Sequence, residues 1–132
     1  MKSAVAAIRS YFQTGWANET KIVFDDEEYT PQAGVPFVRL NIRHTMGDQA
    51  TIGAPGNNRH EQLGGLTVQI FTPQGNASVR ARELTDKAAD LFRGKRTSGI
   101  RFYETTPREI GPDGNGFYQI NVDVRFQYSL YA

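Results

Sequence analysis

The sequence contains no cysteine, and none of its apolar runs approaches the roughly 18 residues that a membrane-spanning helix needs. The missing cysteines exclude disulfides, thiolate metal ligands and a cysteine nucleophile. A surplus of charge of either sign is also missing, because 15 basic residues are balanced by 14 acidic residues. This balance gives no indication of binding to a polyanion or to a membrane surface.

An apolar signal-peptide core is missing as well, because Arg9 interrupts the N-terminal segment before such a core forms. We therefore expect a soluble protein that is not exported. The length of 132 residues is that of one domain, which can bury a single core without disulfides or metals. The predicted organisation is a single domain over residues 1–132.

The clearest pattern that is present is strict alternation over residues 117–130, where every second side chain is apolar or aromatic. This period is typical of a β-strand with one buried face and one wet face. Such a strand would span roughly 45 Å, which is longer than a small domain needs. We expect it to bend at a bulge or to project from its domain toward a neighbour.

The spacing of apolar residues predicts further helices and strands elsewhere in the chain. The helices are predicted over residues 3–14 and 77–93. The other strands are predicted over residues 21–24, 37–46, 64–72 and 99–105. Turn residues in 107–116 return the chain as a hairpin into the last strand. The predicted fold class is α+β: a twisted, mostly antiparallel (mixed) sheet of four to five strands with two helices packed on one face.

Residues 47–62 are polar and rich in glycine, and they show no sustained periodicity. A long segment without regular structure in a compact domain is typically functional or disordered. We therefore expect a mobile loop at residues 47–63 that becomes ordered only against a partner.

The sequence contains no clear catalytic or metal-binding motif. The four consecutive carboxylates of residues 25–28 would attract a hard cation, but neighbouring side chains on extended backbone point to opposite faces, which favours a solvated acidic edge. His44 and His60 lie in different predicted elements and lack the ligand spacing of a zinc site. We expect no enzyme activity, no metal and no cofactor.

One longer stretch has a recognisable pattern. Residues 59–76, RHEQLGGLTVQIFTPQGN, are followed by a helix that contains Ala88, Asp90, Leu91 and Phe92. Together with the N-terminal helix, the early strand with PFVRL at residues 36–40 and the alternating C-terminal strand, this arrangement resembles the lambda-type tail terminator proteins of long-tailed bacteriophages. The resemblance spans nearly the whole chain and includes no catalytic signature.

The resemblance implies a structural role in the virion. Proteins of this family form a hexameric ring that caps the tail tube at its head-proximal end, stops its polymerisation, and then offers a surface to head completion or connector proteins. The implied partners are other copies of the chain, the tail tube protein and a head completion protein, with assembly in the host cytoplasm and no membrane. DNA would pass through the lumen without specific binding.

Two sets of site residues follow as expectations. The predicted loop supplies candidates for the tube or partner contact, and these are Gln49, Thr51, Asn57, Asn58, Arg59 and His60. Side chains opposite the main apolar stripes supply candidates for the ring interface, and these are Phe37, Phe71, Tyr103, Phe117 and Arg125. Each aromatic candidate fits equally well as packing on the second face of the sheet, beneath a helix.

Other functions stay open at this point. A head–tail connector, a completion protein or a tail component of a gene transfer agent or contractile particle would share the predicted architecture. A small nucleic-acid-binding domain is a candidate from another class, because several aromatic and arginine side chains could form a stacking sheet. They are Arg101, Phe102, Tyr103, Tyr118, Arg125, Tyr128 and Tyr131.

Overall fold

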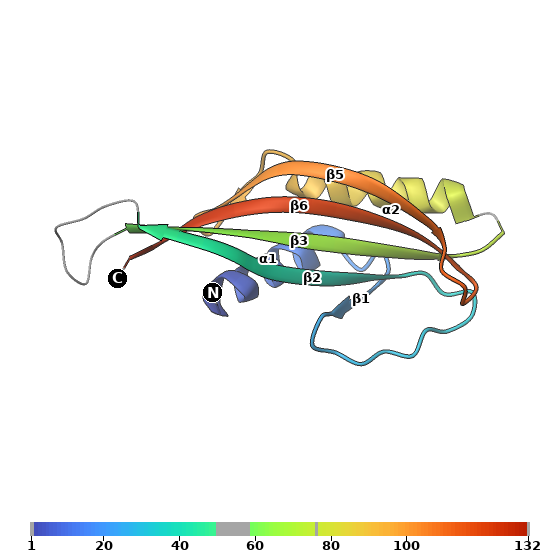
Figure 1. The fold of residues 1–132 in the computed structure, drawn as a ribbon. Helices are drawn as coiled ribbons and strands as arrows, with labels where there is room; N and C mark the ends of the chain where they lie inside the picture. Colours follow the sequence, from blue (N-terminus) through green and yellow to red (C-terminus); the bar gives the residue numbers. More distant parts are fainter. Residues whose placement is uncertain (1, 50–58, 76, 132) are drawn as a thin grey trace.

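The computed structural model describes residues 2–49, 59–75 and 77–131, which form two helices and six strands (Figure 1). In chain order these elements are α1 (Lys2–Trp16), β1 (Lys21–Phe24), β2 (Phe37–Gln49), β3 (Arg59–Pro73), α2 (Ala77–Phe92), β4 (Arg96–Thr97), β5 (Ile100–Pro112) and β6 (Phe117–Tyr131). The predicted α+β class is confirmed, while the sheet has one strand more than the upper end of the predicted range.

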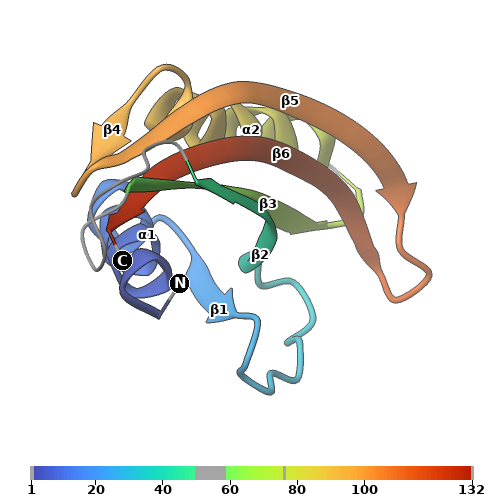
Figure 2. The ribbon, with the colours of Figure 1, turned by 60° about the vertical axis from the view of Figure 1, so that its left-hand side comes forward.

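The strands form one sheet in the order β1-β2-β3-β6-β5-β4. Only β1 and β2 are parallel, and every other neighbouring pair is antiparallel. The sheet is strongly curled, and α1 and α2 lie on the same side of it (Figure 2). One face is therefore covered by helices, while the opposite face has no helix over it among the described elements.

The core fills the space between the helices and the sheet. Alternate residues of the central strands point into it, as the period of two predicts, and these buried residues include Leu40, Val68, Ile70, Val122, Val124 and Phe126. The helices supply large apolar side chains at helical spacing, among them Ile8, Phe12, Trp16, Leu84 and Phe92. Each such side chain contributes about 1.5–3 kcal/mol by burial, so this layer provides most of the stability of the fold.

The predicted mobile loop at residues 47–63 needs correction at both ends. Residues 47–49 belong to β2 and residues 59–63 belong to β3, where Gln49 is paired with His60. The polar side chains of these residues show no alternation, but backbone hydrogen bonds hold the residues in strands. In addition to β2, β3 pairs with β6 along its whole length. Residues 50–58 lie outside the described residues.

The fourth predicted strand, residues 99–105, is also longer in the structure, because β5 continues to Pro112. The strand passes Pro107, which pairs with Val122 of β6. On its other side β5 is paired by β4 at Ile100 and Arg101. A proline that lacks an N–H is tolerated in an edge strand when its nitrogen faces outward. The hairpin turn then closes at Asp113, whose Oδ1 accepts hydrogen bonds from the N–H groups of Asn115 and Phe117.

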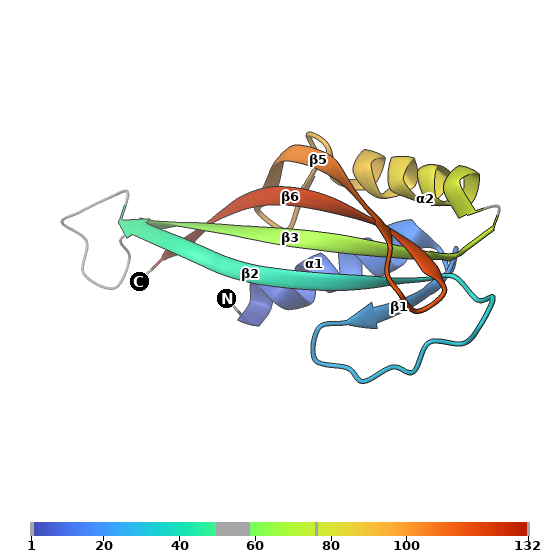
Figure 3. The ribbon, with the colours of Figure 1, turned by 45° about the vertical axis from the view of Figure 1, so that its right-hand side comes forward.

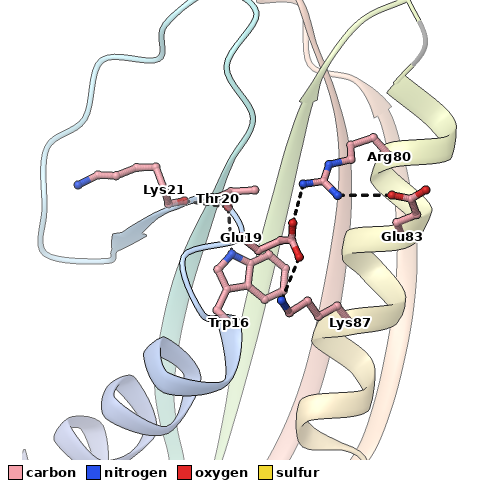
Figure 4. Close-up of polar contacts among 7 residues, drawn as sticks. All are labelled: Trp16, Glu19, Thr20, Lys21, Arg80, Glu83 and Lys87. Carbon is pink, nitrogen blue, oxygen red and sulfur yellow. Dashed lines mark hydrogen bonds and ion pairs between the residues drawn. The ribbon is translucent and has the colours of Figure 1, made fainter.

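Polar contacts fasten the turn after α1 to α2 (Figure 4). The Glu19 carboxylate accepts hydrogen bonds from Arg80 Nη2 at 2.9 Å and from Lys87 Nζ at 3.0 Å. The Lys87 ammonium lies 5.5 Å from the centre of the Trp16 ring, and Trp16 Nε1 donates to Thr20 Oγ1 at 3.0 Å. The group therefore links the end of α1 to the outer side of α2.

We expect Glu19→Gln to lower the thermal unfolding midpoint slightly at neutral pH. The hydrogen bond from Arg80, followed by that from Lys87, holds the pKa of Glu19 below its ordinary value of 4.5. A carboxyl with a lowered folded-state pKa stabilises the fold above its unfolded pKa, and this contribution is lost as the pH falls through the folded pKa. The difference between variant and wild type should therefore shrink below pH 4.5 and at high salt.

The matched control for this variant is Glu83→Gln, which removes a single exposed partner of Arg80 at 3.4 Å. It should leave the unfolding midpoint nearly unchanged. A Glu19→Gln effect that is equal at neutral and acidic pH would contradict the assignment of this contribution to the ionised carboxylate.

Candidate functional site

The face of the sheet without helices carries a polar groove of about 550 Å³. Its walls come from four neighbouring strands, with Asn41 and Arg43 on β2, Thr67 on β3, Asp123 on β6 and the edge strand β5 opposite. These residues occupy the strand positions between the core residues, so the alternation of the sequence places them on this face.

Hydrogen bonds across the strands satisfy many of these polar groups. Asn41 Nδ2 donates to Gln69 Oε1 at 3.0 Å. Asp123 accepts from Thr67 Oγ1 at 2.8 Å and from Arg108 Nε at 3.2 Å. Both Asp123 oxygens are therefore held by partners within the chain. The face has the character of an interaction surface and not of a catalytic centre.

Three of the five ring-interface candidates lie together at one end of this face. Phe37 stacks on Phe71 with ring centres 4.6 Å apart and meets the edge of Phe117 at 5.4 Å. Tyr29, from the connection between β1 and β2, covers Phe37 at 5.0 Å. Phe37 and Phe117 are only 3% and 4% exposed, so the chain itself buries them. They pack on the second face, beneath a connecting segment and not beneath a helix.

The other two ring-interface candidates, Tyr103 and Arg125, line a second groove of about 540 Å³ near the β5 edge. The Tyr103 hydroxyl donates to Gln127 Oε1, and the Arg101 guanidinium lies 4.8 Å from the Tyr103 ring. Arg125 Nη1 is 4.0 Å from Glu104 Oε1, and both side chains are mostly exposed. These two residues, unlike Phe37 and Phe117, are accessible to a neighbouring molecule.

The tube-contact candidates fall partly on the strand ends. Gln49 ends β2 and is paired with His60, while Arg59 begins β3 and is paired with Tyr131 of β6. The ends of β2, β3 and β6 extend past the two helices at one end of the molecule (Figure 3). The remaining candidates, Thr51, Asn57 and Asn58, lie outside the described residues.

The acidic run of residues 25–28 serves local structure. Asp25 and Asp26 both accept from Arg9 of α1, at 2.7 and 3.1 Å. Asp25 also accepts from the N–H of Ile42 on β2 at 3.2 Å. Within residues 2–49, 59–75 and 77–131, no group of three or more histidine or acidic side chains is placed to hold a metal ion. In the same ranges, no helix is long and apolar enough to cross a membrane.

Fold and site together define a small α+β structural module with a curled sheet, an uncovered polar face and strand ends that project beyond its helices. A family model described as phage tail terminator protein matches residues 3–126. The chain belongs to the phage tail terminator family, whose members are structural proteins of the virion and not enzymes. It is therefore a structural component of a phage or phage-like tail.

Solved structures agree with this fold. One chain, whose name states no function, superposes with a TM-score of 0.65 at 16% identity and covers 95% of both chains. A second is a chain from the virion of a native gene transfer agent particle, with a TM-score of 0.54, 17% identity, and coverage of 95% of this chain and 93% of that one. The comparison with curated proteins finds no match.

Proposed function

We propose that the protein forms a homohexameric ring on the head-proximal end of the tail tube, ends tube polymerisation, and provides the surface to which a head completion or connector protein attaches. Membership of the tail terminator family carries this proposal. The members of this family are structural proteins, which agrees with a steric and interfacial role. DNA passes through the ring without sequence-specific binding.

The free sheet edges support a head-to-tail ring. On the outer side of β2, β1 pairs with Phe37–Leu40, and no other described strand pairs with the rest of that edge. On the opposite side of the sheet, β4 pairs with Ile100 and Arg101, and the rest of the β5 edge has no partner among the strands that the structure describes. A closed ring needs two different surfaces on opposite sides of each subunit. The two edges, with Tyr103 and Arg125 beside β5, supply such surfaces.

The projecting strand ends support a separate contact with the tube. Gln49, Arg59 and His60 lie where β2 and β3 extend beyond the helices, and they lead into the candidates Thr51, Asn57 and Asn58. In this proposal the ring interface uses the sides of the sheet, while the tube contact uses its projecting end. The two functions then depend on different residues and can be separated by mutation.

The experiment is tube growth from purified tail tube subunits, followed by light scattering and by tube length in electron micrographs. Addition of this protein in amounts far below the tube subunit should stop elongation. The double variant Tyr103→Ala/Arg125→Ala should lose most of this effect, while Asp90→Ala, on the exposed side of α2, should retain it. Tubes that continue to grow with saturating wild-type protein would contradict the proposal.

A head–tail connector or completion protein is the second candidate function. The gene transfer agent match is compatible with it, because that name gives the particle and not the position of the chain within it. A connector would bind the head side of the joint and leave tube growth unchanged, so the same assay separates the two functions.

A further inference from the structure

On the uncovered face, a glycine lies between two arginines at paired positions of three neighbouring strands. Arg43 of β2 pairs with Gly65 of β3, and Gly65 pairs with Arg125 of β6. Residues paired in this way share a face of the sheet, and all three line the same groove. Since neighbouring strands are about 4.8 Å apart, the two arginine backbones are separated by roughly 10 Å, with no side chain between them.

Packing does not explain the missing side chain at Gly65. A Cβ atom on the preceding Gly64 would lie 2.3 Å from the Phe126 ring and 2.6 Å from the backbone oxygen of Arg43, so that position requires glycine. A Cβ atom on Gly65 would meet nothing closer than the Val124 oxygen at 3.7 Å, an ordinary contact. Glycine inside a strand weakens it, and it often marks a bulge, a tight bend, or a place where a ligand or another backbone approaches closely. The register of β2 and β3 does shift nearby, between His44 and Met46, but Gly65 itself lies in the regular pairing.

The charges around this gap are incompletely neutralised within the chain. Asp123 is occupied by Arg108 and Thr67, so it does not pair with the two flanking arginines. Arg43 is exposed and has no ion pair among the described residues. Arg125 has one, with Glu104 at 4.0 Å, where both side chains are about two-thirds to three-quarters exposed (68% and 74%). Two guanidinium groups therefore border an open space, and both are free to donate hydrogen bonds to an added anion.

We propose that Arg43 and Arg125, across the open space above Gly65, bind a phosphate of a nucleic-acid backbone. Guanidinium groups recognise such oxyanions with paired, charge-assisted hydrogen bonds. The rest of the groove is polar, with Asn41 and Thr67 beside the gap, and phosphate contacts in proteins use side chains of this kind. An acidic protein segment is the other candidate occupant, and the peptide probe in the test below distinguishes it from nucleic acid.

The contact is weak and independent of sequence. Because the contact involves two arginines and the Glu104 carboxylate lies nearby, its affinity for DNA is low and the DNA dissociates readily. The inference depends on the proposed function only to bring DNA to this face, since binding itself is a property of the isolated chain. Wild-type protein that caps tubes but does not bind the duplex would overturn the inference alone, while wild-type protein that binds the duplex but does not cap tubes would overturn the proposed function alone.

The test is fluorescence anisotropy with a labelled DNA duplex, and with a labelled glutamate-rich peptide as a second probe, at low and moderate salt. Wild type should bind the duplex, and Arg43→Gln/Arg125→Gln should weaken this binding at least about tenfold. The same variant should reduce the slope of log K against log salt by about 1, because one phosphate contact is lost. Gly65→Thr, which retains both charges but fills the gap, should also weaken binding.

The control is Arg93→Gln, which removes one charge from an exposed arginine that pairs with Asp90 away from the groove. It should bind the duplex like wild type, and thermal unfolding should show that every variant is folded. The inference would be overturned by a control that weakens binding as much as the double variant, by unchanged binding in Gly65→Thr, by preference for the peptide, or by no duplex binding at low salt.

Discussion

Gly64→Ala is expected to destabilise the protein by about 3 kcal/mol, the upper end of the usual range for overpacking. A methyl group at this position would lie 2.3 Å from the Phe126 ring and 2.6 Å from the Arg43 carbonyl oxygen. Phe126 is 1% exposed and packed in the core, so its ring has little space to move. The carbonyl belongs to the β2 backbone, which is paired with β3 at this point and cannot shift without breaking the pairing.

The neighbouring Gly65→Ala is the matched control, because it introduces the same methyl group on the opposite face of the same strand. Its nearest new contact is at 3.7 Å, so the free energy of unfolding should stay within about 0.5 kcal/mol of wild type. Urea unfolding followed by circular dichroism measures both. Equal stability of the two alanine variants would contradict the packing described for β3 and β6.

Phe92→Ala is expected to destabilise the protein by about 3–5 kcal/mol, as is usual for removal of a buried aromatic ring. Phe92 is fully buried at the end of α2 and stacks on Phe12 of α1 with ring centres 5.8 Å apart. It also meets the Phe102 ring of β5 edge-on at 4.9 Å and the Tyr11 ring at 5.9 Å. One side chain thus joins both helices to the sheet, and its loss leaves a cavity that three elements would have to close.

The control on the same helix is Val79→Ala, because Val79 is 67% exposed. It should change the free energy of unfolding by no more than about 0.5 kcal/mol. Calorimetry or urea unfolding distinguishes the two variants. A small effect of Phe92→Ala would mean that α1 and α2 do not share one core, in contradiction to the structure.

The sequence predicted the elements whose apolar residues recur regularly. Alternation placed β6 and most of β2 and β3 correctly because one face of each strand is buried beneath the helices, and burial is what produces the pattern. The spacing of Leu84, Ala88 and Phe92 likewise predicted α2 on the sheet. These elements depend on local side-chain polarity, which a single sequence records directly.

The sequence did not predict features that depend on distant partners. The polar ends of β2 and β3 are strands because they pair with one another and with β6, and side-chain polarity carries no sign of this pairing. The second half of β5 contains turn residues that are tolerated at a sheet edge. β4 has two residues, too few for any period to be visible.

The roles assigned to the candidate site residues stay a prediction, but the structure shows where these residues lie. Tyr103 and Arg125 are brought together at an accessible groove, whereas Phe37 and Phe117 are buried under the connection that carries Tyr29. Alternation assigned all of them to the second face but could not tell which part of that face the chain covers. The alignment of Arg43, Gly65 and Arg125 could not be predicted from the sequence, because these residues are distant in sequence and only the strand register aligns them.

The measurement that tests the central claim most directly is electron microscopy of tail tubes incubated with the purified protein, with copies per tube counted by image averaging. The account predicts a single layer of six copies at one end of each tube, on the end that joins the head. Copies bound along the sides of the tube, or a protein that stays monomeric and fails to bind tubes at any concentration, would contradict it.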